Sequence, residues 1–124
     1  MADAVATQTL FSGSNKTILK FVNASDGTGE SAVAKVDISG LNGTPTAVKI
    51  NRVWYSVFGM VVKILFDHNT DDFCLALQGD GYHDFRTFGG IPDPASAGGT
   101  GDILFTTVGH SAADSYTIIM ELEW

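Results

Sequence analysis

Apolar and polar residues alternate with a period of two along most of this chain, and this pattern is typical of half-buried β-strands. No segment shows the 3.6-residue period of an amphipathic helix. One side of each predicted strand therefore faces a shared core and the other faces water. The clearest core-facing positions lie in SAVAKVDIS, MVVKILFDH and DSYTIIMELEW: Ala32, Ala34, Val36, Ile38, Val62, Ile64, Phe66, Tyr116, Ile118, Met120, Leu122 and Trp124.

Further strands are predicted near residues 7–11, 16–24, 46–58, 72–78, 83–88 and 102–108, separated by turns rich in Gly, Asn, Asp and Ser. The alternation breaks between Arg52 and Phe58, which predicts a bulge or a bend. Eight or nine short strands at this spacing indicate an all-β, antiparallel β-sandwich over residues 1–124 as a single domain. A jelly-roll type is favoured, although alternation alone does not distinguish it from an immunoglobulin-like sandwich.

Composition and charge limit the classes of partner that this protein is expected to bind. The chain has 124 residues, enough for one core, and its apolar residues never run unbroken for the about 18 residues of a membrane helix. The stretch MADAVATQTLF has no basic residue before an apolar run, so it does not predict a signal peptide. The net charge is −7 and the basic residues are scattered singly, which disfavours nucleic acid as a partner. We therefore expect neither a membrane nor a nucleic-acid partner.

The stretch GDGYHDF, residues 79–85, concentrates ionisable groups on a glycine-rich segment. Its acids are Asp80 and Asp84, with Asp71 and Asp72 just upstream, and His83 lies between them. The spacing lacks the alternate acids and the late glutamate of a calcium loop. The chain's histidines, His68, His83 and His110, are too far apart in sequence to predict a zinc site.

We therefore interpret GDGYHDF as a turn and polar rim at the end of a sheet. Gly79 and Gly81 would serve the backbone conformation, and neither Asp80 nor Asp84 would bind a metal. No metal and no cofactor are predicted.

Catalytic motifs are missing as well. The sequence has no GxSxG elbow, no phosphate-binding glycine loop and no HxH pair, and the last of these argues against a metal-dependent jelly-roll enzyme of the cupin type. The single cysteine, Cys74, lies between Phe73 and Leu75 in a predicted strand and is expected to act as a small hydrophobe. We predict no catalytic residue and no enzymatic activity.

Two stretches, FVNASDGTGESAVAKVDISGL and GTGDILFTTVGHSAADSYTIIMELEW, resemble small virion structural proteins of tailed bacteriophages. The resemblance implies a capsid decoration (cement) protein on the outside of the head, assembled in the host cytoplasm, with the major capsid protein as partner. It also implies self-association, with a homotrimer favoured over a dimer. The alternative is a carbohydrate- or receptor-binding module of the virion surface or tail, for which exposed aromatic rings would form the platform.

Three elements are the expected attachment points: a mobile N-terminal arm (residues 1–10), the glycine-rich loop 88–101 and the terminal tryptophan. The arm and the loop have few side chains that could hold them in one conformation, so we expect a partner surface to order them. The candidate capsid- or subunit-contact residues are Thr7, Leu10, Phe88, Ile91, Pro92, Pro94 and Trp124.

Overall fold

The computed structural model describes residues 4–24, 29–94, 98–109, 111 and 114–124. Within these ranges the chain forms eight strands and two short 3₁₀ turns, with no α-helix. The strands are β1 (Ala4–Ser12), β2 (Lys16–Ala24), β3 (Val33–Val36), β4 (Lys49–Phe66), β5 (Asp72–Asp84), β6 (Ile91–Pro92), β7 (Ile103–Val108) and β8 (Ser115–Glu123); the turns are η1 (Ile38–Gly40) and η2 (Arg86–Phe88). None of the helical segments described is long and apolar enough to cross a membrane.

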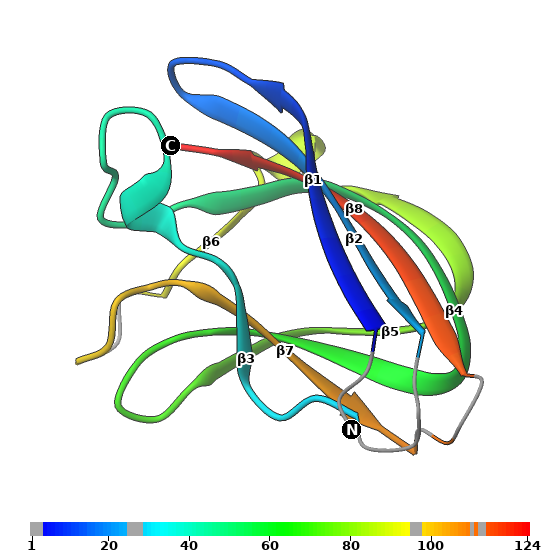
Figure 1. Ribbon diagram of the computed structural model, residues 1–124. Coiled ribbons are helices and arrows are strands. Elements are labelled where there is room, and N and C mark those ends of the chain that lie inside the picture. Colours follow the sequence, from blue (N-terminus) through cyan, green and yellow to red (C-terminus); the bar gives the residue numbers. More distant parts are fainter. Residues whose placement is uncertain (1–3, 25–28, 95–97, 110, 112–113) are drawn as a thin grey trace.

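All pairings between these strands are antiparallel, and they form one sheet in the order β1-β2-β8-β4-β7-β3, with β5 and β6 also paired to β4. The predicted all-β, antiparallel fold class is therefore confirmed. Its two layers belong to a single sheet that curls into a nearly closed, barrel-like arrangement (Figure 1).

The long strand β4, of 18 residues, joins the two layers. Its first part, Lys49–Phe58, pairs with β8, and its last part, Val61–Phe66, pairs with β7, while β5 runs beside both. The sequence analysis treated these parts as separate strands. They are continuous because the bend between them interrupts the register without ending the hydrogen-bonded ladder.

Gly59 is the residue that permits this bend. Its φ is 79°, which favours glycine, and a Cβ atom built on it would lie 2.2 Å from Oδ1 of Asp114. The register of β4 against β5 shifts between Val57 and Val62, as the broken alternation predicted. The bend therefore depends on a residue with no side chain.

The interpretation of GDGYHDF as a turn at the end of the sheet is wrong. Residues 79–84 belong to β5 and pair with residues 57–52 of β4, so 72–78 and 83–88 are not separate strands. Gly79 does need glycine for its backbone, with a φ of 73°. Gly81 is needed for space, because an added Cβ atom would lie 2.5 Å from Oη of Tyr55. These glycines let β5 run alongside β4 next to its bend, and they do not mark a reversal of the chain.

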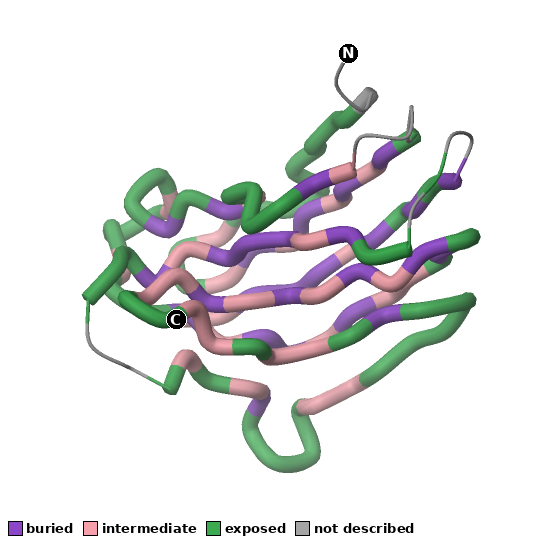
Figure 2. Tube along the Cα trace, turned by 90° about the horizontal axis from the view of Figure 1, so that it is seen from below, coloured by how far each residue is buried: buried purple, intermediate pink, exposed green. Residues whose placement is uncertain are grey.

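Core residues come from both layers and alternate with outward-facing ones along the strands (Figure 2). The predicted inward positions in residues 62–66 and 116–122 are buried, which confirms the register of these segments. In the first segment Val36 and Ile38 are buried, but Ala32 and Ala34 are exposed. Strand β3 is short, and its register against β7 shifts between Ala34 and Val36, so the alternation does not continue through it.

Much of the segment expected to be a mobile N-terminal arm is part of the sheet. Residues 4–12 form β1, which pairs along β2 with Thr7 opposite Phe21. Residues 1–3 lie outside the described ranges. Backbone pairing to β2 supplies the order that the small side chains of this segment do not.

Candidate functional site

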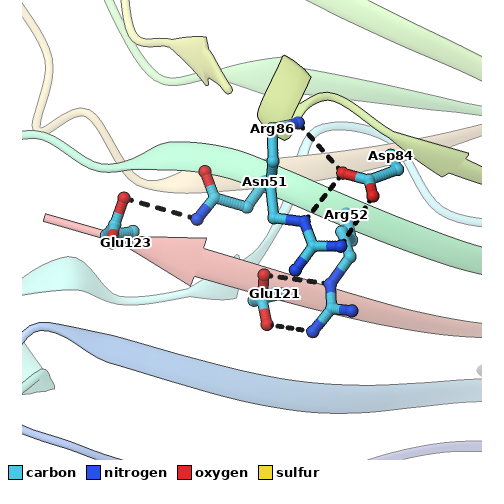
Figure 3. A network of polar contacts seen from close by, with 6 residues as sticks. All are labelled: Asn51, Arg52, Asp84, Arg86, Glu121 and Glu123. Carbon is cyan, nitrogen blue, oxygen red and sulfur yellow. Dashed lines mark hydrogen bonds and ion pairs between the residues drawn. The ribbon is translucent and has the colours of Figure 1, made fainter. Parts of the chain in front are cut away.

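One polar network crosses the outer face of the sheet (Figure 3). The guanidinium of Arg52 on β4 donates two hydrogen bonds to Glu121 on β8, at 3.1 and 2.5 Å. Arg86 donates to Asp84 in the same way, through Nε at 2.9 Å and Nη2 at 2.7 Å. Because each carboxylate faces its own guanidinium, these contacts are balanced in charge. The Arg52–Glu121 pair joins β4 to β8, and the Arg86–Asp84 pair joins η2 to the end of β5.

A second cluster has a different charge balance. His68 and Asp72 lie at the turn between β4 and β5, and Asp93 directly follows β6. Nε2 of His68 is 2.6 Å from Oδ1 of Asp93 and 3.7 Å from Oδ2 of Asp72. The side chains of His68 and Asp93 are only 7% and 2% exposed. Two carboxylates thus converge on one imidazole nitrogen in a largely buried position.

The orientation of this imidazole is fixed from its other side. Nδ1 of His68 lies 2.8 Å from the carbonyl oxygen of Gly98. A carbonyl only accepts, so Nδ1 carries a proton, and the Nε2 that faces the acids has a free lone pair unless it is protonated too. The hydrogen bond to Gly98, and secondly the one to Asp93, raise the pKa of His68 above its ordinary value. The position between Nε2 and Asp93 thus calls for a proton or a metal cation.

The two loops that carry these residues are tied together by further contacts. Oδ2 of Asp67 accepts a hydrogen bond from the hydroxyl of Thr100 at 2.8 Å. Gly99, with a φ of 68°, lies so close to the turn that an added Cβ atom would be 2.3 Å from the carbonyl oxygen of Asp67. The glycines of this loop therefore let its backbone approach the β4–β5 turn closely enough to reach His68.

A small hollow of about 200 Å³ adjoins the cluster. Asp72 lines it, and Pro92 and Pro94, on either side of Asp93 in sequence, line it too. The rest of the lining is formed by Phe66, Phe73, Cys74 and Ile91. Burial raises the pKa of the Cys74 thiol to about 11, so this sulfur is a protonated, apolar part of the wall at neutral pH.

The predicted contact residues divide between several places. Ile91, Pro92 and Pro94 come together at this hollow. Phe88 is exposed and its ring lies 6.0 Å from that of Phe85. Trp124 is partly buried against the core. The remaining two, Thr7 and Leu10, are exposed positions of β1.

Of the residues that the sequence analysis weighed as metal ligands, His68 and Asp72 lie in the cluster described above, whereas Asp80, His83 and Asp84 do not converge. Asp80 accepts a hydrogen bond from Ser56, His83 contacts the hydroxyl of Tyr55, and Asp84 pairs with Arg86. His110 lies outside the described residues.

The sequence analysis set His68 aside as a metal ligand and did not consider Asp93, because 25 residues separate the two. The signal available was that each lies in a polar turn beside a predicted strand. In the described part of the chain, His68, Asp72 and Asp93 form the one group of three or more such side chains whose ligand atoms all lie within 4.8 Å of one another.

Comparison with known proteins assigns neither a family nor an activity to this chain. No family model and no curated protein matches the chain. Among solved structures, a candidate mannose-6-phosphate isomerase from Ralstonia eutropha matches with a TM-score of 0.37 and 9% identity, over 97% of this chain and 83% of that one. This similarity is too low to assign an activity.

The comparisons give no support to the function expected from the sequence. The matching solved structure is named as an isomerase and not as a virion protein. The prediction of a bacteriophage capsid decoration protein, together with its alternative of a virion-surface or tail module, is therefore corrected and given up.

Proposed function

We propose that this protein binds a divalent metal ion through Nε2 of His68 and the carboxylates of Asp72 and Asp93. The observation that carries the proposal is the fixed orientation of the His68 ring, whose Nε2 faces the carboxylates of Asp72 and Asp93. Histidines that bind metals commonly donate their other ring N–H to a backbone carbonyl, as His68 does to Gly98. The arrangement therefore combines a ligand set with the contact that orients it.

The ligand chemistry indicates the class of ion. One imidazole nitrogen with two carboxylates suits Zn²⁺ and related first-row ions such as Mn²⁺, whereas Ca²⁺ and Mg²⁺ prefer sites made of oxygen alone. Three protein ligands leave at least one coordination position, and Asp72 connects the site to the hollow beside it.

The ion takes the place of the proton between His68 and Asp93. A metal with bonds of about 2.0–2.2 Å to each ligand needs these two atoms to separate from 2.6 Å to roughly 3.2 Å. That adjustment is a small rotation of one carboxylate. The bound ion would then hold the β4–β5 turn against the segment after β6, in addition to the contacts already present there.

The test is calorimetric titration of the metal-free protein with Zn²⁺, then with Mn²⁺ and Ca²⁺. We expect one ion per chain, with Zn²⁺ and Mn²⁺ bound more tightly than Ca²⁺. His68→Gln and Asp93→Asn should each weaken Zn²⁺ binding by at least about tenfold. Each substitution removes a ligand atom and changes the volume of the side chain little. Bound metal should also raise the melting temperature of the wild type, by mass action.

The matched control is His83→Gln, which removes an exposed histidine that contacts Tyr55 and lies outside the cluster. This variant should bind Zn²⁺ as the wild type does. Circular dichroism checks that each variant is folded. Absence of binding, or binding that is lost in His83→Gln and kept in His68→Gln, would overturn the proposal.

A further inference from the structure

Strand β1 is an open edge of the sheet. Among the described strands it pairs with β2 alone, so one row of its backbone N–H and C=O groups points away from the protein. Residues 5–12 are all exposed, and three of the exposed large apolar side chains, Val5, Leu10 and Phe11, lie here. A long exposed edge of this kind is a template for another strand.

The other strands with a single described partner carry features that block strand addition. β3 is only four residues long and contains Lys35. β6 has two residues, one of them Pro92. β5 is long, but Asp72, Asp80 and Asp84 lie along it. β1 has nine residues and contains neither a charge nor a proline, so it lacks these protections.

Charge also distinguishes this edge from the rest of the protein. The chain as a whole carries −7, which opposes contact between two copies. The hairpin of β1 and β2 contains no acid, and its ionisable groups are Lys16 and Lys20. The acidic charge that opposes contact between copies is therefore not carried by β1 and β2 themselves.

We infer that β1 pairs antiparallel with β1 of a second copy of this chain, about a twofold axis normal to the sheet. The usable segment is residues 4–9, because the register of β1 shifts after Thr9. The pairing joins the two sheets into one continuous sheet. It produces a dimer, and not the trimer that the sequence analysis favoured.

The geometry also keeps the lysines apart. In the paired sheet Lys20 of each copy lies on β2, three strand spacings from its counterpart, which is about 14 Å. That separation exceeds the screening length of about 8 Å at physiological salt. Val5, Thr7 and Thr9 share one face of β1. In the dimer, their β-branched side chains from the two copies would form one continuous surface across the β1–β1 contact.

Sedimentation velocity of the full chain between about 1 and 200 μM tests this inference. We expect a concentration-dependent dimer. Ala6→Lys places a lysine in each copy close to the twofold axis, so it should weaken dimerisation by at least about tenfold. Val33→Lys is the matched control, because it adds the same charge at the exposed edge strand β3 and should leave the dimer intact.

Hydrogen exchange then locates the contact. The outward-facing amides of residues 5–9 should be protected at high concentration in the wild type and in Val33→Lys, and not in folded Ala6→Lys. Dimerisation equal in Ala6→Lys and wild type would overturn the inference. So would a wild-type monomer at every concentration, or a trimer. Loss of metal binding leaves this test unaffected, since the β1 edge and the His68 cluster share no residue.

Discussion

Arg52 on β4 and Glu121 on β8 form an ion pair through two hydrogen bonds, in which the carboxylate is buried and the guanidinium is not. The Glu121 side chain is 2% exposed and the Arg52 side chain is 23% exposed. The arginine is thus the counter-charge of an acid that has almost no access to water. Such a pair adds little when complete, but removal of one partner leaves an isolated buried charge.

We therefore predict that Arg52→Met destabilises the protein by about 3 kcal/mol, measured by urea unfolding. Methionine keeps the apolar stem of the side chain and removes the guanidinium, with its hydrogen bonds and its position over the Trp54 ring, 5.0 Å from Cζ to the ring centre. The double variant with Glu121→Met should recover most of the loss. Arg86→Ala breaks the exposed pair with Asp84 and should have no measurable effect. Equal losses in Arg52→Met and Arg86→Ala would contradict the prediction.

Glu123 gives the expected dependence on acid. Its hydrogen bond with Lys49, and then that with Asn51, lower the pKa of this carboxyl below the ordinary value of about 4.5. A lowered folded-state pKa stabilises the fold above the unfolded value, and the contribution is lost as the pH falls through the folded value. Glu123→Gln should thus be less stable than wild type at pH 7, with a gap that narrows below about pH 4.5. Melting curves from pH 7 to pH 3 measure the gap, and a constant gap would show that the ion pair is not its source.

Cys74 should be slow to react while the protein is folded. Because burial raises its pKa to about 11 from 9.0, its thiolate fraction at pH 8 is about a hundredfold below that of an unperturbed thiol. Alkylation by iodoacetamide at pH 8, followed by mass spectrometry, should be slower in the native protein than in urea by at least about tenfold. The native rate should go on rising beyond pH 9. A rate equal to the unfolded one would mean that the wall of the hollow opens freely.

Gly59→Ala should disrupt the bend of β4. The new side chain meets both the positive φ of 79° and a contact of 2.2 Å with Asp114. We expect a loss of about 2–4 kcal/mol in unfolding free energy. Gly40→Ala is the control, since no heavy atom lies within 4 Å of its added Cβ. Its stability should stay close to that of wild type, and similar losses in both would remove the special role of the bend.

The alternation of side chains was sufficient to predict the fold class and much of the core. Ile64 and Ile118 are each fully buried, as their positions in the pattern require. This worked because the period of two is a local property: each strand has one face in the core, whichever strand lies beside it.

What the sequence did not decide was which segments are neighbours. GDGYHDF has the composition of a turn, yet its backbone is satisfied by β4, and that pairing depends on a bend some twenty residues earlier in the chain. His68 meets Asp93 because the glycine-rich loop returns to the β4–β5 turn, and no spacing in the sequence encodes that meeting. The open edge of β1 is likewise a consequence of the strand order. Local pattern determines which face of a strand is wet, whereas long-range pairing determines which charges and which edges are left for a ligand or a partner.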